Sequence, residues 1–202
     1  MKANDLKRLA PSSDAPALAR RASEPLIERA LDEGLVDVAV ASMDSPVGEL
    51  LVAVTPRGLV SVAFESEPRD EVLERIARRV SPRVLEAAAP TDEARREIEE
   101  YFRSARRAFD LRIDHRLMSA FTRSVLDATA GVGFGELATY GEIAERIRRP
   151  RAARAVGRAL GSNPIPIVIP CHRVVGAKGA LTGYAGGLPR KQTLLRLEGS
   201  LA

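Results

Sequence analysis

The sequence predicts an α+β protein, in which a small antiparallel sheet with flanking helices precedes a mostly helical region. Three observations support this. Short apolar runs separated by turn residues fill positions 36–64, which is typical of strands in a meander. Amphipathic helical periodicity dominates from about 119 to 160. Two short helices in that second region are joined by a tight turn, which predicts a helix-turn-helix.

The composition is that of an ordinary globular protein. The chain has 202 residues, of which 45% are hydrophobic and 29% are charged. No apolar run approaches the roughly 18 residues that a membrane span needs, and no apolar signal core follows the first basic residues. We therefore expect a cytoplasmic protein without a membrane partner.

Three parts of the chain differ in pattern. Residues 1–34 form an extension with one candidate helix, which Ser23 would cap, Pro25 would open and Gly34 would end. A solvated tail is the alternative for this segment. Residues 35–114 form an N-terminal structural domain, and residues 118–202 form a C-terminal domain that carries the chemistry.

The strands and helices of the N-terminal structural domain are predicted from hydrophobic periodicity and from turn residues. We expect strands at 36–40, 49–54 and 59–64, separated by turns, and helices at 70–80 and 92–105. The three strands predict an antiparallel meander. Nothing in this half of the sequence groups residues of catalytic type, so we assign it a structural role.

The C-terminal domain begins with an amphipathic helix from about 119. Thr139 with Glu142 forms a predicted capping box for a helix at 140–147, and a second short helix follows at 152–160. Its small residues would let it approach another surface closely, or would pack inside a core. Six arginines crowd this helix pair and indicate a polyanionic partner: Arg146, Arg148, Arg149, Arg151, Arg154 and Arg158.

Cys171 is the single cysteine of the chain, and His172 follows it directly. A thiol becomes a good nucleophile only as the thiolate, and an adjacent imidazole can take its proton. A lone cysteine is more often a small buried hydrophobe. Prolines before it predict a stiff, extended segment that would hold the thiol in place: Pro164, Pro166 and Pro170. One cysteine and two histidines exclude an intrachain disulfide and leave too few ligands for an ordinary zinc site.

Several ordered motifs resemble the O6-alkylguanine-DNA alkyltransferases, also called methylated-DNA–protein-cysteine methyltransferases. The resemblance covers roughly residues 43–199 and leaves residues 1–34 outside. Its most specific element is Pro-Cys-His-Arg-Val-Val at 170–175. It is supported by Phe-Gly-Glu at 134–136, Ala-Ala-Arg-Ala-Val-Gly at 152–157, Asn-Pro at 163–164 and Tyr-Ala-Gly-Gly-Leu at 184–188.

The resemblance implies a suicide repair reaction on double-stranded DNA. The alkyl group of O6-alkylguanine, mainly O6-methylguanine, would move irreversibly to Cys171, and O4-methylthymine is a second candidate substrate. The base would be flipped out of the duplex to reach the thiol. No cofactor is needed, because the lesion itself supplies the alkyl group. The resemblance also implies a protein that is a monomer in the free state.

The resemblance also implies roles for individual residues. Cys171 would be the acceptor, His172 the base that takes its proton through a water molecule, and Glu198 the carboxylate that orients the imidazole. Asn163 would brace the cysteine segment, and Tyr140 would donate a hydrogen bond toward the purine. Arg154 would be the finger that fills the space the base leaves in the duplex. The residues that would line the base pocket are Tyr184, Ala185, Val174, Leu160 and Thr182. The residues that would contact DNA phosphates are Arg151, Arg158 and Lys191.

Three other functions compete with this interpretation. A lesion-binding module without the acceptor cysteine is disfavoured by Cys171 itself. A methyl-sensing transcription regulator would need a cysteine-rich zinc domain, which a single cysteine cannot form. A cysteine hydrolase that uses Cys171, His172 and Glu198 would turn over repeatedly rather than once.

Overall fold

The computed structural model describes residues 15–201, which divide between Val36 and Asp37 into two compact units. The first unit contains helix α1 (Ala15–Asp32). This helix begins well before the predicted cap at Ser23, and Pro25 lies inside it, because the Ala- and Arg-rich residues upstream favour a helix. It ends as predicted near Gly34, which adopts the left-handed conformation with φ 65°.

The second unit begins with a four-stranded sheet in the order β3-β2-β1-β4. The strands are β1 (Val38–Met43), β2 (Leu50–Thr55), β3 (Gly58–Phe64) and β4 (Val84–Glu86). The first three form the predicted antiparallel meander, whereas β4 pairs in parallel with β1 and makes the sheet mixed. Strand β4 was not predicted, because its three residues are too few to show the two-residue period of a strand.

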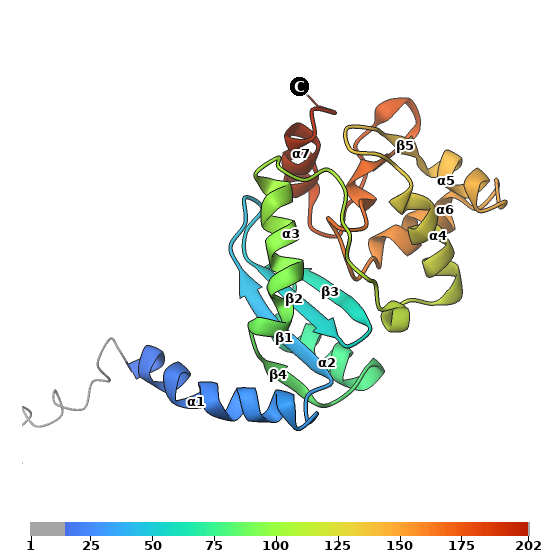
Figure 1. Cartoon of the computed structure of the whole chain (residues 1–202). Coiled ribbons are helices and arrows are strands. Elements are labelled where there is room, and N and C mark those ends of the chain that lie inside the picture. Colours follow the sequence, from blue (N-terminus) through green and yellow to red (C-terminus); the bar gives the residue numbers. More distant parts are fainter. Residues whose placement is uncertain (1–14, 202) are drawn as a thin grey trace, which may run out of the picture. The chain divides into compact units, whose positions relative to one another are not determined.

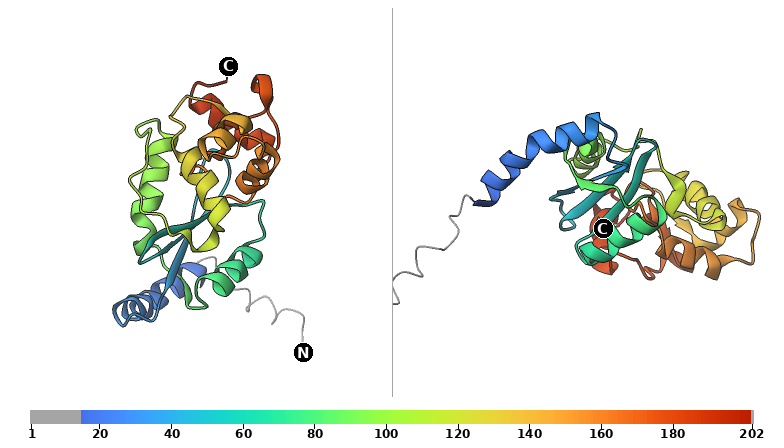
Figure 2. Two further views of the ribbon diagram at one scale, coloured as in Figure 1. Left: turned by 90° about the vertical axis from the view of Figure 1, so that its right-hand side faces the viewer. Right: turned by 90° about the horizontal axis from the view of Figure 1, so that it is seen from below.

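Helices cover both faces of this sheet, as Figures 1 and 2 show. Helix α2 (Arg69–Arg79) packs Val72 and Ile76 on one face. Helix α3 (Asp92–Phe102) packs Ile98 and Tyr101 into the larger cluster on the other face. Alternate residues of β2 enter the two clusters, so Leu50 faces α3 and Leu51 faces α2. The face toward α3 therefore connects the sheet to the rest of the core.

The remainder of the unit is mostly helical, as predicted. It comprises α4 (Ala120–Ala130), α5 (Tyr140–Arg146), α6 (Ala153–Gly161) and α7 (Leu188–Leu197), with the short parallel strands β5 (Ala138–Thr139) and β6 (Val174–Val175). Thr139 and Glu142 form the predicted capping box at the start of α5. Short 3-10 helices lie at Ala89–Thr91, His115–Leu117, Cys171–Arg173 and Ala177–Gly179.

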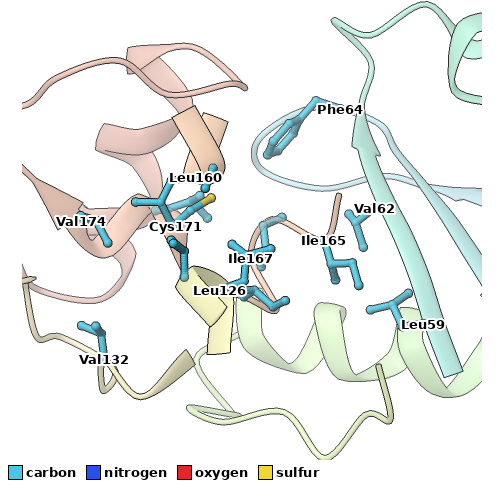
Figure 3. Packing of buried hydrophobic residues seen from close by; sticks show 14 of the residues in the cluster. Leu59, Val62, Phe64, Leu126, Val132, Leu160, Ile165, Ile167, Cys171 and Val174 are labelled. Atoms are coloured by element: carbon cyan, nitrogen blue, oxygen red, sulfur yellow. The ribbon is translucent and has the colours of Figure 1, made fainter. Parts of the chain in front are cut away.

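One hydrophobic cluster joins the sheet to this helical region. Figure 3 shows Ile165 and Ile167 between the side chains of β3 and Leu126 of α4, with the Cys171 sulfur in the same cluster. The backbone N–H of Val62 in β3 also donates to the carbonyl of Pro164 at 2.8 Å. The sheet therefore supports the segment that leads to the cysteine.

That segment is not the extended ramp that its prolines predict. Residues 164–169 form turns and bends, in which the N–H of Ile169 donates to the carbonyl of Ile165 at 3.0 Å. Ile167 is fully buried with φ 74°, a left-handed conformation that a β-branched residue rarely adopts. The surrounding core imposes this compact turn, which local propensity does not predict.

Among residues 15–201, no helix combines the length and the apolar character that a membrane span requires.

Candidate active site

Cys171 opens the 3-10 helix before β6 and is 5% exposed. It is a free cysteine. The side chain of Asn163, which follows α6, donates from Nδ2 to the Cys171 sulfur at 3.1 Å and to the carbonyl of Ile169 at 2.9 Å. Its Oδ1 accepts from the N–H of Ile165 at 3.0 Å. Asn163 therefore fixes both the turn and the thiol, which is the position that a bracing residue would need.

His172 lies beside the cysteine with its ring fully buried. Its Nε2 donates to Oε1 of Glu198 at 2.9 Å, because an ionised carboxylate can only accept. Glu198 follows α7 and is brought to the histidine by the packing of Leu194 and Leu195 in the core. The neutral ring then carries its lone pair on Nδ1, which is buried and has no hydrogen-bond partner among the described residues. That atom is free to accept a proton.

Glu198 is held by more donors than the sequence analysis foresaw. Arg173 donates from Nε to Oε2 and from Nη2 to Oε1, each at 2.9 Å. The hydroxyl of Tyr101 in α3 donates to Oε1 at 2.7 Å. The structural half therefore reaches the candidate active site, which corrects our assignment of a purely structural role. The apolar spacing of α3 already places Tyr101 on its buried face, where a hydroxyl needs a partner.

Burial and charge set the protonation states of these three groups. Burial raises the pKa of Glu198, but hydrogen bonds from His172 and Arg173 outweigh it and lower this pKa to about 2. Burial lowers the pKa of His172 below 6.5, more than Glu198 raises it. Burial likewise raises the pKa of Cys171 above 9.0, although the Asn163 hydrogen bond and the Lys191 charge oppose this. The resting site therefore holds a neutral thiol and a neutral imidazole beside a carboxylate.

A groove of about 640 Å³ has Tyr184 in its lining, and the side chain of Tyr184 interacts with that of Cys171. Helix α6, the start of α5 and the loop at 182–185 line it. The lining residues are Tyr140, Ala153, Arg154, Gly157, Gly161, Thr182, Gly183, Tyr184 and Ala185. A volume of this size lies within the range of small-molecule sites and accommodates a nucleobase.

Tyr140 and Tyr184 form walls of the groove. Thr182 Oγ1 donates to the hydroxyl of Tyr140 at 3.0 Å, which leaves the Tyr140 proton free for another acceptor. The ring of Tyr184 packs edge-on against Phe64 of β3, with centroids 6.0 Å apart. A side chain at Gly186 would come within 2.7 Å of that Phe64 ring, so the loop requires glycine there. The sheet thus also supports the wall of the groove.

Two predicted residues, Leu160 and Lys191, lie elsewhere than expected, and the carbonyl of a third, Val174, already has a partner. Leu160 is 5% exposed within the core and does not line the groove. The carbonyl of Val174 already accepts from Nζ of Lys191 at 2.6 Å, although its second lone pair is available. Lys191 itself is completely buried, so the prediction of a phosphate contact is wrong for this residue. The lysine instead ties β6 to the carbonyl of Thr182 in the groove loop at 3.4 Å.

The arginine cluster lies on the surface of the helix pair, and all six side chains are exposed. Arg154 also lines the groove. Within residues 15–201, no ion pair is found for Arg151, Arg154 or Arg158, so their charges are available to an outside anion. Arg148, in the turn between α5 and α6, adopts a left-handed conformation with φ 57°. Both interpretations of α6 hold in part, because Val156, Ala159 and Leu160 are buried in the core while Ala153, Arg154 and Gly157 line the groove.

Two family models match the chain. The ribonuclease-like domain of 6-O-methylguanine DNA methyltransferase matches residues 38–115, and the DNA binding domain of the same enzyme matches residues 120–200. A methylated-DNA–protein-cysteine methyltransferase of Methanosarcina acetivorans is 42% identical over 161 residues, which are 79% of this chain and 97% of that protein. The chain belongs to the methylated-DNA–protein-cysteine methyltransferase family.

Other relatives agree with this result. A methyltransferase of the same name from Mycolicibacterium paratuberculosis is 43% identical over 157 residues, covering 78% of this chain and 90% of that protein. The crystal structure of the Mycobacterium tuberculosis O6-methylguanine methyltransferase has a TM-score of 0.70 at 37% identity and covers 82% of this chain and 94% of that chain. The predicted family, enzyme class and α+β fold are thus confirmed.

A second solved structure includes nucleic acid. The Mycobacterium tuberculosis OGT in complex with DNA has a TM-score of 0.70 at 37% identity and covers 80% of this chain and 93% of that chain. Together with the DNA-binding family model over residues 120–200, it supports DNA as the partner of this protein.

Proposed function

We propose that this protein repairs alkylated DNA by moving the alkyl group of O6-alkylguanine to Cys171 in a single, irreversible event. The observation that carries the proposal is the buried Cys171 with His172 next to it in the chain and hydrogen-bonded to Glu198, near a groove lined by residues of the arginine-rich helix pair. Transfer breaks the bond between O6 and the alkyl carbon and forms a thioether at the sulfur. A thioether has no easy leaving step, so the protein is consumed.

The proton path follows from the hydrogen bonds. The thiol proton would pass through a water molecule to the free Nδ1 of His172, and Glu198 would stabilise the resulting imidazolium through Nε2. The leaving group is a guanine anion. The Tyr140 hydroxyl would donate to it, and Thr182 holds that hydroxyl in place. The electron pair of the broken bond remains on guanine, and the proton that His172 took from the thiol would return through water to this anion, which restores neutral guanine and the neutral imidazole.

Recognition requires the damaged nucleotide to leave the duplex, because a stacked base cannot reach a thiol that is 5% exposed. The groove would receive the base between Tyr140 and Tyr184, with the backbone at Ala185 and the carbonyl of Val174 on its edge. Arg154 would enter the space that the base vacates. Exposed Arg151 and Arg158 would contact phosphates.

O4-methylthymine carries its methyl group on an equivalent exocyclic oxygen and is a second substrate to test.

Residues 35–114 and 118–202 act as two domains, and the family matches at 38–115 and 120–200 support this division. The protein is a monomer before it meets DNA.

The test is to follow protein mass and lesion content together, after incubation with a duplex that carries one O6-methylguanine. We expect each protein molecule to gain the mass of one CH2 group and to remove one lesion, and the Cys171→Ser variant to do neither. Tight lesion binding without a mass gain would instead identify a lesion-binding module. Removal of many lesions per protein would identify a hydrolase and overturn the proposal.

The rate of transfer should be nearly independent of pH between 6.5 and 9.0. His172 loses its function as a base only when it is protonated, and its pKa lies below 6.5. The Cys171 thiol ionises on its own only above 9.0. Single-turnover rate constants should therefore vary less than about two-fold in this interval. A ten-fold fall on acidification from 9.0 to 6.5 would contradict this assignment of base and nucleophile.

A further inference from the structure

Tyr101 connects the sheet-bearing half of the protein to the reacting groups. It is fully buried near the end of α3, and its ring packs against Phe102, Phe109 and Phe134. Its hydroxyl donates to Glu198 at 2.7 Å. Glu198 is 97 positions away in the sequence. The aromatic packing fixes the ring, so the direction of this hydrogen bond is also fixed.

The oxygen that accepts from Tyr101 is the same one that accepts from His172. Oε1 of Glu198 receives both hydrogen bonds, at 2.7 and 2.9 Å. Burial and the nearby Glu198 charge raise the pKa of Tyr101 far above its ordinary value, so the hydroxyl remains a donor at every pH of interest. Arg173 Nη2 donates to the same oxygen at 2.9 Å, so Tyr101 is one of two further donors that withdraw charge from the hydrogen bond between Oε1 and the imidazole.

We propose that Tyr101 is a positioning residue for alkyl transfer, which orients Glu198 and limits how strongly this carboxylate stabilises the His172 imidazolium. The inference rests on the proposed function, since it concerns the same transfer. It gives the sheet-bearing half a direct part in the reaction, because α3 carries the hydroxyl and is anchored on the sheet by Ala94 and Ile98.

Few charged or titratable groups surround His172, and each can be assigned to a segment of the described structure. Glu198 and Lys191 belong to the α7 region, Arg173 follows the histidine, and Cys171 precedes it. Tyr101 is the donor contributed from α3. Removal of its hydroxyl therefore changes one hydrogen bond to Glu198 and leaves the other neighbours in place.

The test uses Tyr101→Phe in the full-length protein, with Thr129→Val as the matched control. Thr129 is also fully buried, and its hydroxyl donates to the carbonyl of Val125 in the same helix and not to Glu198. The control substitution therefore also removes one buried hydroxyl. We expect the single-turnover rate constant at saturating duplex to fall about ten-fold in Tyr101→Phe, as is typical when an orienting partner is removed. The affinity for the duplex should not change. The control should retain the rate of the unsubstituted protein.

A histidine-selective NMR titration separates this role from a merely structural one. The chain has two histidines, so His115 serves as an internal reference. With more charge left on Oε1, the pKa of His172 should rise in Tyr101→Phe and remain unchanged in Thr129→Val. Incorporation of 3-fluorotyrosine at position 101 retains the ring and strengthens the donor, so the pKa of His172 should then fall.

The outcomes are distinguishable. If the unsubstituted protein transfers no alkyl group, the proposed function itself fails, whatever the NMR titration shows. If it does transfer, but both Tyr101 variants keep its rate constant and its His172 pKa, the inference is overturned. Should the phenylalanine variant fail to fold, the fluorotyrosine protein decides alone: an unmoved His172 pKa there refutes the positioning role.

Discussion

Replacement of Glu198 by glutamine should destabilise the protein and nearly abolish alkyl transfer. Arg173 would be left as a buried cation without its carboxylate, and breaking such a pair costs about 3–5 kcal/mol. The lowered pKa of Glu198 gives a loss of stability of the same order of magnitude, because a shift from 4.5 to about 2 corresponds to roughly 3 kcal/mol. The imidazolium of His172 would also lose its counter-charge, so the transfer rate should fall at least about 100-fold.

Urea unfolding and single-turnover kinetics measure the two effects. Glu93→Gln is the matched control, because this carboxylate is exposed in the first turn of α3 and should change stability by less than about 1 kcal/mol. The carboxylate stabilises the fold above pH 4.5, and this contribution is lost as pH falls toward about 2. The stability difference between Glu198→Gln and the unsubstituted protein should therefore shrink over that interval. A difference that stays constant there would contradict the account of Glu198.

Arg154→Ala should slow transfer from duplex DNA far more than transfer from the free base. Arg154 is exposed beside the groove, where it would fill the space of the flipped nucleotide. Without it the base returns to the stack, and holding a base out costs a few kcal/mol. We expect about a 100-fold lower rate constant with a duplex that contains O6-methylguanine.

Free O6-methylguanine is the internal comparison, since it needs no flipping and should react at nearly the same rate with Arg154→Ala. Arg57→Ala removes the same charge from an exposed turn between β2 and β3 and should leave both rates unchanged. Equal losses of rate on the duplex and on the free base would show that Arg154 acts in the transfer step and not in base flipping. An unchanged rate on the duplex would show that Arg154 has no part in repair.

Local signals in the sequence predicted much of the fold and of the site. The apolar runs and turns of β1 to β3, the capping box at Thr139 and the periodicity of α4 depend on neighbours within a few positions, and each appears in the structure. The pairing of Cys171 with His172 was also visible, because the two residues are adjacent. The family resemblance then pointed to Glu198, which the structure places on the histidine.

Other features depend on contacts between distant segments. The hydrogen bond from Tyr101 to Glu198 joins α3 to the end of α7, and no local sequence pattern predicts it. Lys191 was expected on the surface, as lysines usually are, but the fold buries it against two carbonyls. The turn at Ile167 adopts a left-handed conformation that its β-branched side chain disfavours. The tertiary core decides all three.

The most direct measurement locates the alkyl group after reaction. A duplex whose O6-methylguanine carries an isotope-labelled methyl group would be incubated with the protein, and the digested peptides would be sequenced by mass spectrometry. Our account predicts one labelled methyl group, present as S-methylcysteine at position 171, with the guanine restored in the DNA. Repair of the guanine with the label on another residue, or released into solution, would contradict the account.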